Sequence, residues 1–146
     1  EKFYYHYRIY PYKNKAVKSL KKQPKMYMWD WSQVKDEPAR LENMVASHLL
    51  KTAHLLNDFF GYKAELHFLH DIDGREVDFL LTVANKPWLA VEVKQSERGI
   101  SPHLKYFSKK FEIPFLYQVV LNADGVDYTQ DGVRIMGLKK FLSGLV

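Results

Sequence analysis

The sequence predicts an α/β domain, because a long stretch with helical periodicity is followed by short strand-like stretches and then by a second helical stretch. With 146 residues, of which 47% are hydrophobic, the chain has the length of one domain and enough apolar residues for a core. No apolar run approaches the roughly 18 residues that a membrane-spanning helix needs. The expected core order is helix, three antiparallel strands, helix and strand.

The first helix is expected over residues 37–57, where apolar side chains recur at steps of three and four residues. Asp36 precedes this stretch as a potential N-cap, and Pro38 lies in its first turn. Gly61 follows, and a glycine at this place is typical of the end of a helix.

Three strands are expected next. Residues 62–70 and 75–84 flank Asp73-Gly74, a dipeptide that favours a tight hairpin turn. A second turn at residues 85–87 leads to a third strand over residues 88–95. Neighbouring strands of this kind are therefore expected to pair antiparallel.

The C-terminal part of the chain is expected to hold the second helix, over residues 101–111, and a strongly apolar strand over residues 115–121. A turn-rich stretch, 122–132, separates them from a short strand at 133–136 and a terminal helix near 138–142.

The N-terminal segment, residues 1–24, is interpreted as a basic linker or edge segment, and residues 25–146 as the folded domain. Residues 1–25 hold eight cations and one anion, whereas the remainder holds 14 cations and 16 anions. This distribution suits contact with a polyanion such as nucleic acid, and a solvated lysine-rich linker is the alternative. Aromatic residues suggest a strand or extended linker at 3–12 and a short strand at 26–31.

The chain contains no cysteine, which excludes disulfides, thiolate metal sites and cysteine nucleophiles and fits a reducing cytoplasm. It also lacks a Gly-rich phosphate-binding loop, so these residues do not bind ATP by that device.

Charged residues interrupt two of the expected strands. By the alternation of side chains along a strand, Glu92 and Lys94 share one face of the third strand. Alternation also puts Asp78 with Leu80, opposite Val77, and the hairpin can bring Asp78 beside Glu92. Such charges are costly on a buried strand unless partners compensate them.

Two carboxylates at one edge of a sheet form a hard-oxygen site suited to Mg²⁺ or Mn²⁺. The amine of Lys94 could then polarise a water molecule or neutralise the charge that develops on a phosphate. The alternative is a structural pair of Glu92 and Lys94 on an exposed face, with Asp78 solvated.

Glu42 adds a third acid. It lies beside the apolar stripe of the first helix, in register with Ala46 and Leu49, and can lean toward the sheet. Its alternative role is that of a first-turn acid that complements the helix dipole.

An acid on the first helix, an aspartate on the second strand and Glu-x-Lys on the third resemble the pattern of PD-(D/E)XK, or restriction-endonuclease-like, nucleases. Residues 24–30, 41–50, 75–80 and 91–94 are similar to one branch in particular. This branch is the uncharacterised C-terminal domain that follows an AAA-type ATPase module in many prokaryotic ATP-binding proteins. The resemblance covers about residues 13–121.

The resemblance implies a mixed sheet flanked by helices and a metal-dependent phosphodiester hydrolase. Glu42, Asp78, Glu92 and Lys94 would be its catalytic set, and the three acids would bind Mg²⁺ or Mn²⁺. It further implies a cytoplasmic protein without a membrane segment, DNA rather than RNA as partner, and ATP bound only by an ATPase module in a missing N-terminal region. Because fold does not imply activity, a catalytically inactive nucleic-acid or protein binding module of the same fold is the alternative, and a dimerisation domain is a third.

Overall fold

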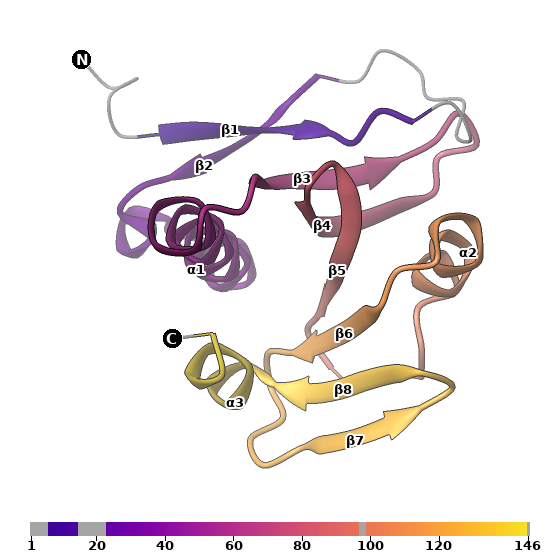
Figure 1. The fold of residues 1–146 in the computed structure, drawn as a ribbon. Coiled ribbons are helices and arrows are strands. Elements are labelled where there is room, and N and C mark those ends of the chain that lie inside the picture. The colour runs from indigo at the N-terminus through magenta and orange to yellow at the C-terminus, as the bar shows by residue number, and fades with distance from the viewer. Residues whose placement is uncertain (1–5, 15–22, 97–98, 146) are drawn as a thin grey trace.

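One mixed sheet of eight strands organises the chain, which the computed structural model describes over residues 6–14, 23–96 and 99–145. The strands lie side by side in the order β2-β1-β3-β4-β5-β6-β8-β7 (Figure 1). Their bounds are β1 (His6–Pro11), β2 (Lys25–Met28), β3 (Ala64–His70), β4 (Glu76–Val83), β5 (Lys86–Lys94), β6 (Phe115–Val120), β7 (Asp127–Gln130) and β8 (Val133–Gly137).

The helices cover both faces of this sheet. Helix α1 (Glu37–Phe60) and the short helix α3 (Leu138–Ser143) pack into one apolar cluster, and α2 (Pro102–Phe111) packs into a second cluster on the opposite face. Figure 1 shows α1 and α3 on one side of β5 and α2 on the other. A 3-10 turn, η2 (Trp31–Gln33), connects β2 to α1. None of the helices in the described residues combines the length and apolar content of a membrane span.

The first helix begins where its capping residues predicted. The Asp36 side chain accepts a hydrogen bond from the backbone N–H of Ala39 at 3.1 Å. The helix continues one turn beyond the expected residue 57 and ends at Phe60, where Gly61 adopts a left-handed conformation with φ 69°.

The central strands follow the expected order. Strands β3 and β4 form the antiparallel hairpin around Asp73-Gly74, β4 and β5 pair antiparallel, and β6 joins β5 in parallel after α2. The turn between β4 and β5 lies at Ala84 and Asn85, with φ of 54° and 65°, slightly earlier than expected. These pairings confirm the α/β class, whereas the restriction-endonuclease-like fold itself stays a prediction.

The sheet is larger than the expected core of four strands. Strand β7 lies in the stretch predicted as turns, and its residues are mostly exposed, so no apolar alternation marks it. Left-handed φ angles at Asp131 and Gly132, 51° and 80°, form the turn that folds β7 back onto β8.

The N-terminal segment contributes a strand inside the sheet. Strand β1 pairs antiparallel with β2 and parallel with β3. The lysine-rich part of the segment, on which the expected contact with a polyanion mostly depends, spans residues 15–22 and lies outside the described residues.

Strand β2 is fastened to α1 by Asn43, which is 4% exposed. The Asn43 amide donates to the carbonyl oxygen of Met28 and its side-chain oxygen accepts from the Met28 backbone N–H, both at 2.8 Å. These two bonds fix the outer strand of the sheet against the first helix.

We expect Asn43→Ala to lower the free energy of unfolding by about 2 kcal/mol, because both backbone groups of Met28 lose their partner in a partly buried place. Thermal unfolding followed by circular dichroism should show a drop of about 5 °C. The matched control is Asn122→Ala, which changes an exposed residue shortly after β6, a strand that is distant from β2 in the sheet. Equal melting temperatures for the two variants would contradict the role of Asn43.

Candidate active site

A β-bulge turns Asp78 away from the position that simple alternation predicts. His67 pairs with Leu80 and Leu69 pairs with Val77, so Asp78 and its successor Phe79 both lie opposite the single residue Phe68. Alternation is interrupted here, and Val77 packs in the α2-side cluster rather than with Phe79 as expected. Bulges of this kind re-aim side chains beside functional sites.

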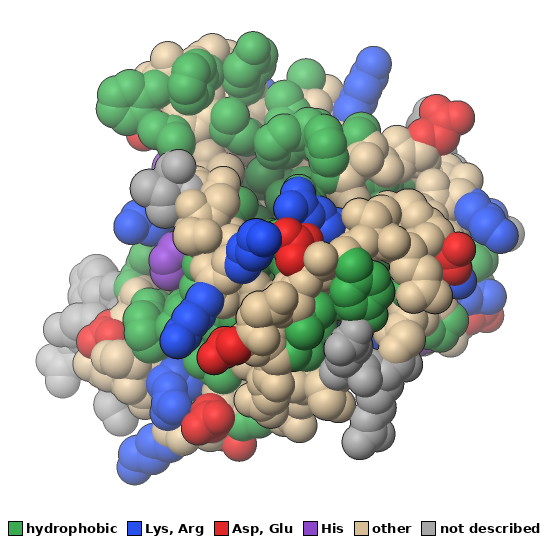
Figure 2. Space-filling model, turned by 90° about the horizontal axis from the view of Figure 1, so that it is seen from below, with side chains coloured by type: hydrophobic (Ala, Val, Ile, Leu, Met, Phe, Trp, Pro, Cys, Tyr) green, Lys and Arg blue, Asp and Glu red, His purple; other side chains and the backbone are tan. Residues whose placement is uncertain are grey.

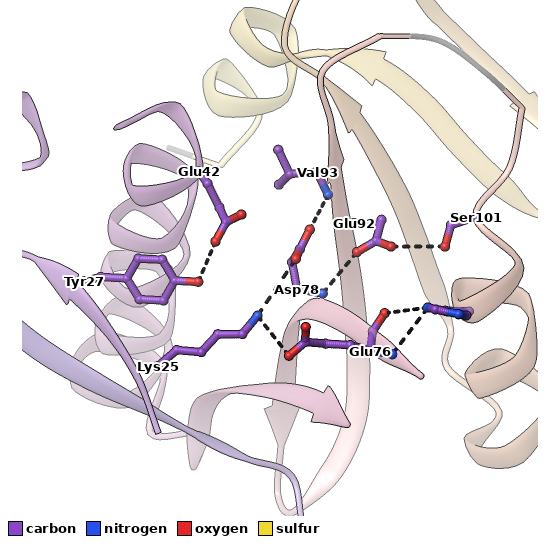
Figure 3. A network of polar contacts seen from close by, with 9 residues as sticks. Lys25, Tyr27, Glu42, Glu76, Asp78, Glu92, Val93 and Ser101 are labelled. Carbon is purple, nitrogen blue, oxygen red and sulfur yellow. Dashed lines mark hydrogen bonds and ion pairs between the residues drawn. The ribbon is translucent and has the colours of Figure 1, made fainter. Parts of the chain in front are cut away.

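Next to Asp78, side-chain hydrogen bonds replace the backbone ladder between β4 and β5. Backbone pairing extends from Val83–Lys86 to Phe79–Val91. Beyond it, the Asp78 N–H donates to Glu92 Oε1 at 3.2 Å, and the Val93 N–H donates to Asp78 Oδ2 at 2.8 Å. The two carboxylates are therefore held between the backbones of the diverging strands, and the structure places Asp78 beside Glu92 (Figure 3).

Glu42 approaches the same place from α1. The Tyr27 hydroxyl on β2 donates to Glu42 Oε2 at 2.8 Å and orients the carboxylate toward Asp78 (Figure 3). Burial, and then the charge of Asp78, raise the pKa of Glu42. The three predicted acids thus lie on three elements, with Asp78 close enough to both Glu42 and Glu92 for an electrostatic interaction with each.

Two basic or polar partners of this site were missed by the sequence analysis. Lys25 on β2 places its Nζ 3.6 Å from Glu76 Oε1 and 3.9 Å from Asp78 Oδ1. His103 on α2 contacts the backbone of Glu76 through Nδ1 at 3.3–3.4 Å. The alternating burial of β2 could have indicated that Lys25 and Tyr27 share an inward face, but it could not name the partner.

A buried polar network holds Glu92 from the α2 side. The hydroxyl of Ser101, the N-cap of α2, donates to Glu92 Oε2 at 3.1 Å. Gln118 on β6 is fully buried, accepts from the Ser101 N–H at 2.9 Å and donates to the Gly99 carbonyl oxygen at 2.7 Å. The sequence pattern indicated Ser101 only as the start of a helix, and no pattern indicated Gln118.

Lys94 lies beside Glu92 but apart from the other acids. Together with Ser101 it lines a hollow of about 320 Å³ at the beginning of α2. Its ammonium makes no hydrogen bond or ion pair with another described residue, so the structural pair of Glu92 and Lys94 considered from the sequence is not formed.

Burial and neighbouring charges in the site disfavour the ionised form of its carboxyl groups. Burial, and then the neighbouring charge of Glu92, raise the pKa of Asp78 to about 7, while Lys25 acts in the opposite direction. The Tyr27 pKa is also raised well above its ordinary range, by burial and then by Glu42. Buried carboxylates with raised pKa values are typical of a place that receives a cation.

The donor set fits a hard divalent ion by its chemistry, since Glu42, Asp78 and Glu92 offer carboxylate oxygens only. Within the described residues, however, no three acidic or histidine side chains are already arranged to hold a metal ion. Asp78 and Glu92 are engaged with backbone N–H groups instead, and Asp78 also with Lys25. In each case the backbone N–H group bonds to one carboxylate oxygen only, Glu92 Oε1 or Asp78 Oδ2.

A largely apolar hollow lies elsewhere in the molecule. Its volume is about 450 Å³, and Trp88, Phe115 and Phe141 contribute to its wall. Arg134 and Lys140 also line it, but both are paired with Asp127 at 3.0 and 2.6 Å. Figure 2 shows one face of the molecule, where hydrophobic side chains gather at one edge next to charges of both signs. The hollow offers mainly apolar contact, and none of the predicted site residues lines it.

We expect Asp78→Asn to stabilise the metal-free domain at pH 8. The folded-state pKa of Asp78, about 7, lies above its ordinary 3.8, so folding favours the protonated carboxyl. The stabilisation that the protonated carboxyl gives to the folded state is complete below about pH 4 and is lost as the pH rises to 7. Asparagine stays neutral. The free energy of unfolding of Asp78→Asn should therefore exceed that of wild type by an amount that increases over this range, to about 1 kcal/mol or more at pH 8. Thermal unfolding of both proteins with a chelator at pH 4.5, 6 and 8 measures this difference in stability. A difference that does not change with pH would contradict the raised pKa of Asp78.

Comparison with known proteins gives one result. Residues 39–141 match the family described as "Domain of unknown function (DUF4143)", and this range includes most of α1, β3 to β8, α2 and most of α3. No curated protein and no solved structure matches the chain. Because the match covers more than half of the sequence, the chain belongs to the DUF4143 family, whose domains occur in proteins associated with AAA-type ATPases.

Proposed function

We propose that this domain is a metal-dependent phosphodiester hydrolase of the PD-(D/E)XK class that acts on DNA. The observation that supports it most is the convergence of Glu42, Asp78 and Glu92 from α1, β4 and β5 at the point where the β4–β5 ladder opens. Proteins keep such costly charges together mainly where chemistry requires them. The order helix, three antiparallel strands, helix, strand agrees with this class.

The residues of this chain would divide the work as follows. Asp78 and Glu92 would bind Mg²⁺ or Mn²⁺ directly, and Glu42, oriented by Tyr27, would complete the oxygen ligands from α1. The bound ion supplies Lewis acidity and a water of lowered pKa. Lys94, which has no ionic partner among the described residues, would neutralise charge on the scissile phosphate.

The proposed setting of the domain is a cytoplasmic protein in which an AAA-type ATPase module acts on the same DNA. The occurrence of DUF4143 domains with AAA-type ATPases supports the partner. The excess of eight cations over one anion in residues 1–25 supports a nucleic-acid ligand, because each neutralised phosphate releases counterions.

A second candidate is a catalytically inactive module that binds nucleic acid or protein through the same fold. The observation that favours it is the present arrangement of the acids. Asp78 and Glu92 each accept a hydrogen bond from a backbone N–H group, and Asp78 also pairs with Lys25. The two functions differ in one respect that can be measured, which is cleavage.

We expect the protein to nick supercoiled and single-stranded DNA with Mg²⁺ or Mn²⁺, and Asp78→Asn or Glu92→Gln to reduce the rate by about two orders of magnitude or more. Glu42→Gln should weaken metal affinity more modestly. Lys94→Met should slow cleavage but leave metal affinity intact, because the ammonium acts on the phosphate. The assay compares the domain alone with the full-length protein and ATP.

The matched control is Glu65→Gln, which changes an exposed acid on β3 and should cleave as wild type does. Ca²⁺ should support DNA binding without cleavage, because its loose coordination positions water poorly. If wild type binds DNA but cuts it with neither Mg²⁺ nor Mn²⁺, the binding module is the correct function.

A further inference from the structure

Among the described residues, Lys25 is the cation that forms an ion pair with a carboxylate of the candidate site. Its Nζ lies 3.6 Å from Glu76 Oε1 and 3.9 Å from Asp78 Oδ1, and 4.7 Å from the centre of the Phe68 ring. Only 21% of its side chain is exposed. The ammonium is therefore held by two acids and an aromatic face, a place that suits a cation on three independent grounds.

This position is close to the one that a metal ion would take. A divalent ion bound by Asp78 must sit within about 2.5 Å of a carboxylate oxygen. Lys25 already contacts the Oδ1 atom of Asp78, while Oδ2 is engaged with the Val93 N–H. Two cations that share one carboxylate repel each other, and the repulsion is larger here because the side chains of Lys25 and Asp78 are only 21% and 19% exposed.

We propose that Lys25 is a tethered counter-cation that neutralises the carboxylates of the metal-free site and must leave Asp78 when a divalent ion binds. The inference rests on the proposed metal-dependent function and adds a residue that competes with the metal. It assigns Lys25 a role in setting metal affinity, separate from the role of Lys94 on the other side of Glu92.

The structure provides room for this displacement. A hollow of about 420 Å³ between β2 and the beginning of α1 is lined by Lys25, Tyr27 and Glu42. Asn43 fixes the backbone of β2 at Met28, so the strand can stay in place while the long lysine side chain rotates. Glu76 Oε1 lies 3.6 Å from the ammonium and can keep it near the site after Asp78 is released.

The test is calorimetric titration of Mn²⁺ into the chelator-treated protein at pH 8, without nucleic acid. Lys25→Met removes the charge but keeps an unbranched side chain, and the dissociation constant should fall at least about tenfold. Lys25→Arg keeps the charge and should bind no more tightly than wild type. Lys63→Met, which removes an exposed lysine, is the matched control.

Chemical labelling of wild type provides a second measurement that needs no variant to fold. With an amine-acylating reagent and mass spectrometry, Lys25 should react slowly in the metal-free protein and several-fold faster with saturating Mg²⁺. Labelling of Lys63 should not change.

The outcomes separate this inference from the proposed function. Tighter binding by Lys25→Met alone, with Mg²⁺-dependent labelling, supports the competition. Measurable but equal or weaker Mn²⁺ binding by Lys25→Met overturns the inference and leaves the metal-dependent function standing. Absence of Mn²⁺ binding in every variant overturns both.

Discussion

The pair of bonds that Asp78 and Glu92 exchange with the backbones of β4 and β5 is the constraint on which the site depends. Antiparallel strands normally satisfy their N–H groups with carbonyl oxygens of the neighbour. Here two carboxylates take over that role, so the strands can separate while their N–H groups stay paired. The bulge at Asp78 and Phe79 belongs to the pairing of β4 with β3, and it lies at the same level of β4 where the ladder with β5 ends.

The arrangement has an energetic cost, and the fold reduces it from several directions. Burial and mutual repulsion raise the pKa of Asp78 and of Glu42. Lys25 from β2 and Ser101 from α2 offset part of this by an ion pair and a hydrogen bond. Since each compensating group comes from a different element, the site requires the whole central sheet and both flanking helices. A domain without a use for these acids would be more stable with neutral side chains.

The N-terminal strands contribute more than an extension of the sheet. Because β1 inserts between β2 and β3, β2 lies against the beginning of α1 and its inward residues Lys25 and Tyr27 reach the acids. The family match begins at residue 39, after both strands. The wall of the site on this side is therefore built by a segment that precedes the matched range.

Elements whose signals are local could be predicted from the amino-acid sequence alone. Helix α1 follows from its apolar period and the Asp36 cap, and the β3–β4 hairpin from Asp73-Gly74, because short-range geometry fixes both. The residue types at Glu42 and Glu92 were also sufficient to select them as candidates. These features need no knowledge of distant contacts.

Which side chains contact one another depends on the packing of distant elements. The bulge at Asp78 depends on pairing with β3, and alternation along β4 alone could not indicate it. Lys25 precedes Asp78 by more than 50 residues and meets it only through the position of β2 in the sheet. Lys94 lies two residues from Glu92, yet it faces a different hollow from the one lined by Glu42. Spacing along the chain defines a strand's faces, whereas strand order and helix packing define what each face contacts.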